Sequence, residues 1–285
     1  MGSDTTNPTE AATSVVPGSS GLSDLTTFGK VRLAAFALVV LATIGMAGVA
    51  LGELFSLLVL GWTADTGAEL GIHRLHVMGI AATIFTTLLG VIVQLYRPTR
   101  QATAMLGAFL SVVAAAAITV GVGGPLEGVL PFLVLISLAT VLHPAGRDLL
   151  QRGESYSPAM LALVAVAAVP MLAFAADQVT RQLTASDPHA AVGHYSAMAQ
   201  FAVVPLVYAG LAAIGMRGWR VAAWVGALPV AYYGLLAVSF TGQTGSTGVT
   251  WGSAAVLWAA SFVVVTEYSR SGDSPTLRRS AAEGD

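Results

Sequence analysis

The chain has 285 residues, of which 55% are hydrophobic and only 10% are charged, and its formal net charge is −2. Soluble domains carry about 25% charged residues, so this composition argues against an ordinary water-soluble fold. The chain has no cysteine, which excludes disulfides, thiolate metal sites, iron–sulfur clusters and thiol catalysis.

Apolar runs of roughly twenty residues recur along the chain. That length matches a hydrocarbon layer about 30 Å thick at a rise of 1.5 Å per helical residue. Inside lipid only helices and closed barrels satisfy every backbone group, and these runs are too long and too uniformly apolar for barrel strands. The sequence therefore predicts an all-α polytopic membrane protein in contact with the lipid bilayer, and we expect no nucleic acid as a partner.

The predicted elements begin after an N-terminal segment, residues 1–29, that is rich in Ser, Thr, Gly and Pro. This composition predicts a disordered tail. A second polar tail, also expected to be disordered, follows over residues 269–285. Between the tails we expect eight membrane spans, over residues 33–60, 74–96, 102–122, 126–143, 158–179, 194–216, 219–240 and 249–268.

Basic residues are concentrated in the segments on one side of these spans. If the N-terminus is cytoplasmic, the inner segments hold eleven Lys and Arg residues, whereas the outer segments hold only Arg74 and Arg181. This asymmetry is what the positive-inside rule describes. It predicts that both termini are cytoplasmic. The high content of Arg, Ala, Gly and Val without Cys is typical of a GC-rich prokaryote, so the expected location is a prokaryotic cell membrane.

Similar features recur about 120 residues apart. Arg97 and Arg217 each begin an Arg-x-x-Arg motif at the end of an expected span, and His73 and His194 lie at the starts of the same two spans. Because each half holds four spans, this recurrence predicts two pseudo-symmetric four-helix bundles, residues 30–152 and 153–268, related by an axis along the membrane normal.

Polar side chains gather at one expected face of the membrane, the extracytoplasmic one. Imidazole binds haem iron, copper or zinc through one ring nitrogen, and a neighbouring carboxylate orients the ring. We therefore expect a cofactor there, b-type haem or, as the alternative, copper, with His73 and His194 as iron or copper ligands. The expected cofactor-binding histidines are His73, His76, His189 and His194, and the expected supporting or proton-handling groups are Glu53, Glu69, Asp177 and Arg74.

Two further features have structural interpretations. The outer arginines, Arg74 and Arg181, are expected either to neutralise an anionic group such as a haem propionate or to pair with Glu69 and Asp177. His143, the one histidine at the opposite face, precedes a proline, and a residue in that position leaves the helical conformation. His143 is therefore predicted to end a helix.

Glu69, His73-Arg74 and His194 lie at the outer starts of the second and sixth expected spans. In this respect residues 33–268 resemble the haem A synthase family, which has eight spans in two pseudo-symmetric four-helix bundles with both termini inside. The run His-x-x-His-x-x-Gly that starts at His73 is also similar to helices of small proteins related to haem–copper oxidase subunit I. Both resemblances imply a haem-binding or oxidase-associated membrane protein.

The leading hypothesis is that this site serves electron transfer, or the assembly of a respiratory oxidase or of its haem. Its expected partners are oxidase subunits or small copper or haem redox proteins, and whether the chain is an enzyme stays open. One alternative is a small-solute or ion transporter with parallel repeats, although charged residues, which usually mark a transport path, are scarce at the span centres. The other is a structural membrane protein whose outer histidines are only interfacial.

Overall fold

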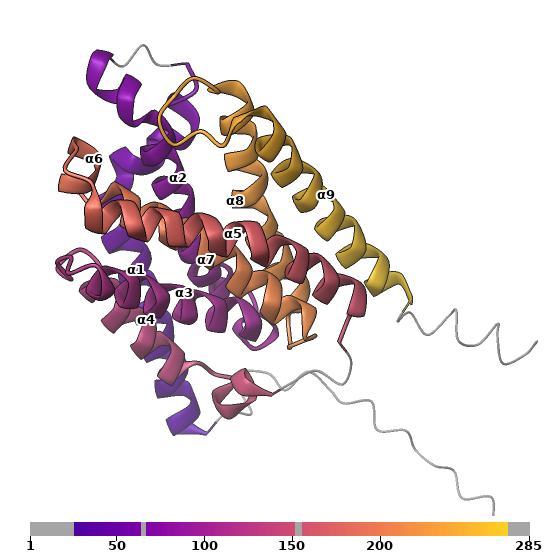
Figure 1. Ribbon diagram of the computed structural model, residues 1–285. Helices are drawn as coiled ribbons and strands as arrows, with labels where there is room; N and C mark the ends of the chain where they lie inside the picture. The colour runs from indigo at the N-terminus through magenta and orange to yellow at the C-terminus, as the bar shows by residue number, and fades with distance from the viewer. Residues whose placement is uncertain (1–25, 64–66, 152–155, 273–285) are drawn as a thin grey trace, which may run out of the picture.

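The computed structural model describes residues 26–63, 67–151 and 156–272, without the side chains of residues 67–72 and 270–272 (Figure 1). Within these residues the chain is helical and has no β-strand, which confirms the all-α prediction. Most of the two expected tails, residues 1–25 and 273–285, lies outside the described residues.

The helices follow the apolar runs of the sequence. In chain order they are α1 (Thr27–Leu60), α2 (Gly67–Ile92), α3 (Ala102–Gly121), α4 (Leu130–Leu142), α5 (Pro158–Thr184), α6 (Pro188–Ala191), α7 (His194–Ala213), α8 (Trp219–Ser239) and α9 (Gly248–Gly272), with 3-10 turns η2 (Val93–Leu95), η3 (Pro98–Arg100) and η4 (Gly146–Leu150).

Seven of these helices are long and apolar enough to cross a membrane, namely α1, α2, α3, α5, α7, α8 and α9. The chain is thus a multi-pass integral membrane protein, as predicted. The fourth expected span, residues 126–143, contains only the 13-residue helix α4. At 1.5 Å per residue such a helix is about 20 Å long, which is less than the hydrocarbon thickness of about 30 Å. The count of eight spans and the cytoplasmic termini stay predictions.

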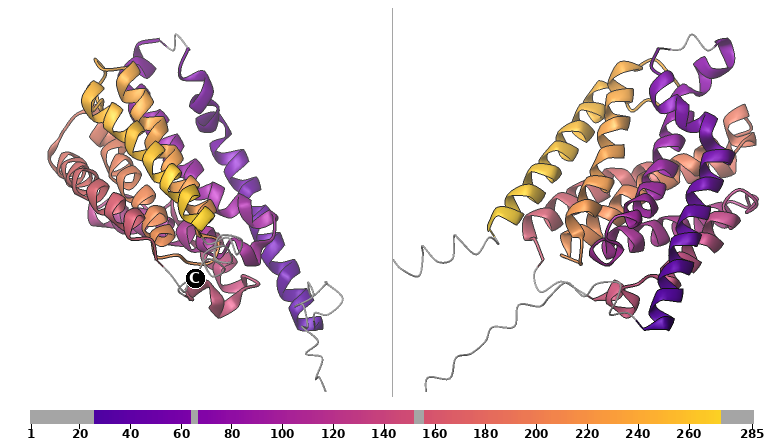
Figure 2. Two further views of the ribbon diagram at one scale, coloured as in Figure 1. Left: turned by 90° about the vertical axis from the view of Figure 1, so that its right-hand side faces the viewer. Right: turned by 180° about the vertical axis from the view of Figure 1, so that it is seen from behind.

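Four helices, α2, α3, α7 and α8, form the centre of the bundle, because α2 and α3 each pack against both α7 and α8. Helix α1 packs on α2 and α4, whereas α5 packs on α7, and α9 packs on α8. Helices α1 and α9 therefore lie on opposite sides of the bundle (Figure 2). Helix α1 buries a single stripe, Phe36, Val40, Thr43 and Ala47, whose spacing of three and four residues keeps them on one helical face.

His143 ends helix α4, as predicted, and follows its last residue, Leu142. Its Nδ1 accepts a hydrogen bond from the backbone N–H of Ala145, at 3.2 Å. The ring proton is therefore assigned to Nε2, which donates to Gln94 Oε1 at 3.1 Å. Arg32 donates to the carbonyl oxygens at the end of α4. Both nitrogens of this buried ring thus have partners within the chain, which is typical of a structural histidine.

The starts of α2 and α7 lie close to α6 and to the connection between α8 and α9, residues 240–247. We call this part of the bundle the histidine end. Gly193 caps α7 with a positive φ of 75°, a conformation that glycine adopts without steric cost. This tight turn between α6 and α7 places His194 at the first residue of α7, beside His189 of α6.

Candidate functional site

Four imidazole rings meet at the histidine end, from His73 and His76 on α2, His189 on α6 and His194 on α7. The ring centroids of His73 and His189 are 4.4 Å apart, those of His76 and His189 are 4.7 Å apart, and those of His73 and His194 are 5.0 Å apart. The centroid of His194 lies 5.9 Å from those of both His76 and His189. The fold thus brings together all four histidines singled out in the sequence, and we call them the histidine cluster.

Five ring nitrogens of the cluster are buried without a hydrogen-bond partner among the described residues. They are His73 Nδ1, both nitrogens of His76, His189 Nε2 and His194 Nδ1. A buried polar atom without a partner costs about 1–3 kcal/mol, and such atoms are rare in folded proteins. In contrast to the fully bonded ring of His143, each of these rings has at least one nitrogen without a partner among the described residues, and a neutral imidazole offers one lone pair.

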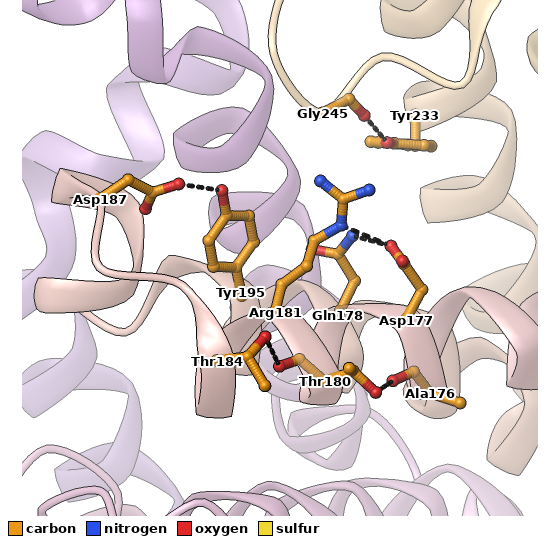
Figure 3. A network of polar contacts seen from close by, with 10 residues as sticks. All are labelled: Ala176, Asp177, Gln178, Thr180, Arg181, Thr184, Asp187, Tyr195, Tyr233 and Gly245. Atoms are coloured by element: carbon orange, nitrogen blue, oxygen red, sulfur yellow. Dashed lines mark hydrogen bonds and ion pairs between the residues drawn. The ribbon is translucent and has the colours of Figure 1, made fainter.

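A carboxylate next to the cluster determines how His189 is presented. Asp187 caps α6, and its Oδ1 accepts a hydrogen bond from the backbone N–H of Ala190 at 2.9 Å. Its Oδ2 accepts a hydrogen bond from the Tyr195 hydroxyl at 2.7 Å (Figure 3). The hydrogen bond from Ala190 has the largest effect and the one from Tyr195 the next largest, and together they hold the pKa of Asp187 below its usual range.

The same carboxylate lies beside one nitrogen of the His189 ring. Asp187 Oδ1 is 3.8 Å from His189 Nδ1, which favours a proton on that nitrogen. The other nitrogen, Nε2, is the buried atom without a partner among the described residues. His189 is therefore arranged to present the lone pair of Nε2 to the cluster.

Asp187 and Tyr195 were not singled out in the sequence. The available signal was local, because an aspartate directly before a proline is typical of the start of a helix, with Asp187 as its cap. That signal indicates a cap and does not indicate a contact with a histidine. The ring of Tyr195 also packs against the cluster, since its centroid lies 5.7 Å from those of His76 and His189.

The connection between α8 and α9 closes over His76. Gly245 has a φ of +88°, and a Cβ at this position would stand 2.8 Å from His76 Cε1, so only glycine fits there without displacement. The Tyr233 hydroxyl donates a hydrogen bond to the carbonyl of Gly245 and fixes the segment in this position (Figure 3). The cluster is thus covered by chain from a distant part of the sequence.

Three of the expected supporting groups, Asp177, Arg74 and Glu53, have described side chains. Asp177 pairs with Arg181 at 2.8 Å, which confirms one of the two interpretations of that arginine. Arg74 lies over the ring of Phe240, with its Cζ 5.0 Å from the ring centroid. Glu53 is exposed on α1. The side chain of Glu69 lies outside the described residues.

Among the described side chains, those of residues 26–63, 73–151 and 156–269, no three histidine, aspartate or glutamate residues are arranged so that they could hold a metal ion as they stand. The separations of the ring centroids are those of packed rings, about 4.5–7 Å, and they also lie near the value for ligands of one ion. With metal–nitrogen bonds of about 2.0–2.1 Å, imidazole centroids around a tetrahedral ion lie roughly 5 Å apart. The observed separations of 4.4–5.9 Å bracket this value. Rotation about χ2, a broad torsion in histidine, changes where the nitrogens point without moving the helices.

Comparison with known proteins finds no matching family model, no similar curated protein and no similar solved structure. The resemblance to the haem A synthase family stays a prediction.

Proposed function

We propose that the histidine cluster binds one copper ion, and that the protein handles copper at the extracytoplasmic face of a prokaryotic membrane. The observation that carries this proposal is the set of five buried imidazole nitrogens without partners among the described residues, contributed by rings only 4.4–5.9 Å apart. Copper bound there would supply a one-electron centre, suited to electron transfer or to delivery of the metal during oxidase assembly.

The ligand set favours copper among the metals that imidazole binds. Neutral imidazole suits copper, zinc, iron and nickel, and copper(II) binds most tightly of the divalent first-row metals. Met198 adds a soft thioether close by, fully buried and one helical turn after His194. Its Sδ lies 3.0 Å from the place where a Cβ of Gly79 would stand, and Gly79 is one turn after His76. Soft thioether ligands favour copper(I), so Met198 is a candidate further ligand one turn below the rings.

The chain's own residues would hold the ion and exclude water. His189 would bind through Nε2, with its other nitrogen turned to Asp187, and Tyr195 would keep that carboxylate in place. Gly245 and the rest of residues 240–247 would cover His76 from the side of the α8–α9 connection. Small copper or haem redox proteins, or subunits of a respiratory oxidase, are the partners that such a site would serve.

The packing of the helices supports the two-repeat organisation that we infer with this site. A repeat of about 120 residues relates α2 to α7 and α3 to α8. Helix α2 packs against α8. The repeat maps this pair onto α7 and α3, and these two helices also pack against each other. An axis along the membrane normal between α2 and α7 would bring His73 and His194 toward each other from the two halves.

A second candidate ligand is b-type haem, held by His76 and His194. Their ring planes are 16° apart and their centroids 5.9 Å apart. Two axial imidazoles on one iron, with iron–nitrogen bonds of about 2 Å like those to zinc, would have centroids roughly 6 Å apart. Copper is preferred because the rings of His73 and His189 crowd the same place, and four converging rings suit a small ion better than a macrocycle.

The test is metal analysis combined with absorption spectroscopy. The protein is expressed with copper and haem both supplied, purified from membranes, and measured oxidised and dithionite-reduced. We expect close to one copper per chain and no haem bands. A Soret band and an α-band without copper would replace copper by the second candidate. Stoichiometric levels of neither copper nor haem would refute both candidates.

A further inference from the structure

A groove lies between α5 and α9, with α8 and α7 as its floor, and has a volume of about 750 Å³. Sites for small molecules typically have volumes of about 300–1,000 Å³. No charged residue is among its described lining residues, and the helices that form it are membrane-spanning. Val166 and Val169 at its edge are 67% and 74% exposed, so the groove opens toward the hydrocarbon of the bilayer. Its occupant must therefore come from the membrane.

Aromatic rings form both walls of this groove. On one side stands Phe174 of α5, whose ring centroid lies 6.3 Å from that of Tyr233 on the floor, where Tyr233 packs against Phe201 at 4.8 Å. On the other side stand Trp251 and Trp258 of α9. The indole N–H of Trp258 donates to the carbonyl of Leu163 at 2.8 Å, which fixes this ring in place. Such walls suit a planar ring, because aromatic rings stack or meet edge to face.

The polar groups of the groove are confined to one end of it. Thr247 supplies a hydroxyl at the histidine end, next to the α8–α9 connection, whereas the nearby Tyr233 hydroxyl donates its proton to the Gly245 carbonyl. Trp258 lies ten residues into α9, or about 15 Å along the helix, which is close to half of the hydrocarbon thickness. The groove therefore runs from a polar end near the membrane surface to an apolar end near the bilayer centre.

We propose that this groove binds one membrane-dissolved quinone, a benzoquinone or naphthoquinone with an isoprenoid tail. The planar head would lie between the aromatic walls and accept a hydrogen bond from Thr247, and the tail would follow the apolar half of the groove. A lipid acyl chain has no planar ring to stack on these aromatic side chains. Tyr233 lines this groove and also holds the α8–α9 connection over His76, but quinone binding does not require copper.

The test is photoaffinity labelling of the full chain in lipid nanodiscs. The probe is a short-chain azido-benzoquinone, the competitor is an unlabelled decyl-benzoquinone, and labelled peptides are identified by mass spectrometry. Ala173→Phe narrows the groove, because Ala173 lines it on α5. Ala176→Phe is the matched control, since Ala176 is exposed three residues further along the same helix and is not a lining residue.

We expect saturable labelling of α5 and α9 peptides that the competitor removes. Ala173→Phe should weaken binding by roughly tenfold or more, while Ala176→Phe leaves it unchanged. Equal melting temperatures of the two variants show that the loss is not caused by unfolding. Labelling that does not saturate, that is equal in both variants, or that a fatty acid removes as well as the quinone does, would overturn the proposal in favour of ordinary lipid contact.

Discussion

The imidazole rings of His73 and His194 meet edge to face with their centroids 5.0 Å apart, although 121 positions separate the two residues in the sequence. One ring comes from α2 and the other from the start of α7, and the two helices pack against each other in the centre of the bundle. This contact joins the two halves of the chain at the place where buried nitrogens lack partners among the described residues. The copper proposal rests on this meeting of rings from the two halves of the chain.

Replacing Asp187 by asparagine should weaken copper binding without disturbing the fold. Asparagine still caps α6, but it removes the negative charge beside His189 Nδ1. Loss of a carboxylate that orients a metal-binding histidine typically costs 10–100-fold in metal affinity, so we expect a change of roughly that size in a competition titration. Asp177→Asn is the control, because Asp177 pairs with Arg181. Equal effects of both substitutions would remove Asp187 from the site.

The depressed pKa of Asp187 gives a pH dependence that can be measured without copper. A carboxyl whose pKa is lower in the folded than in the unfolded chain stabilises the fold above its unfolded pKa. That contribution is lost as the pH falls through the folded pKa. The backbone N–H of Ala190 donates to Asp187. As the pH is lowered, it should therefore stay protected from hydrogen exchange down to the ordinary pKa of a carboxyl group and lose its protection at lower pH. Protection in Asp187→Asn should not follow this transition.

Gly245 should be required for the cluster to keep its shape. In Gly245→Ala the new methyl group would meet the ring of His76, and the positive φ disfavours alanine as well. We expect a weaker copper affinity together with a lower melting temperature. Gly242→Ala is a matched control in the same connection, because a Cβ there meets nothing within 4 Å. A Gly245→Ala variant that binds copper like the wild type would show that this connection does not shape the site.

Close packing at Tyr208 should make Gly107 intolerant of substitution. Tyr208 is fully buried on α7, and a Cβ on Gly107 of α3 would collide with its ring. Overpacking of this kind costs about 1–3 kcal/mol, which should appear as a lower melting temperature in detergent. Gly210→Ala, where a Cβ meets nothing within 4 Å, should melt like the wild type. Unchanged melting of Gly107→Ala would contradict the central packing of α3 on α7.

Hydrophobicity alone was sufficient to predict the spans, because runs such as that of α1 leave no other way to satisfy the backbone in lipid. The fourth expected span, residues 126–143, holds only α4 as regular helix, because three glycines and a proline interrupt residues 122–129. The four histidines could be grouped because each stands next to the start of an apolar run.

The rest of the site depends on tertiary structure. Gly245 covers His76 across 169 positions, and no local pattern in the sequence indicates that contact. Asp187 carried a helix-cap signal, but its position beside His189 and Tyr195 follows from the tight turn between α6 and α7. The aromatic groove likewise combines residues of α5 and α9, whose sequences show only ordinary membrane helices.

The most direct measurement of the central claim is a copper titration of the metal-free protein against a competing chelator, in the wild type and in two histidine variants. We expect one copper per chain in the wild type and a loss of roughly 100-fold in affinity, or about 2.7 kcal/mol, for His194→Ala. His143→Ala, which breaks the hydrogen bond to Gln94, should lower the melting temperature and keep the full copper affinity. A wild type without stoichiometric copper, or a His194→Ala variant that binds copper as tightly as the wild type, would contradict the account.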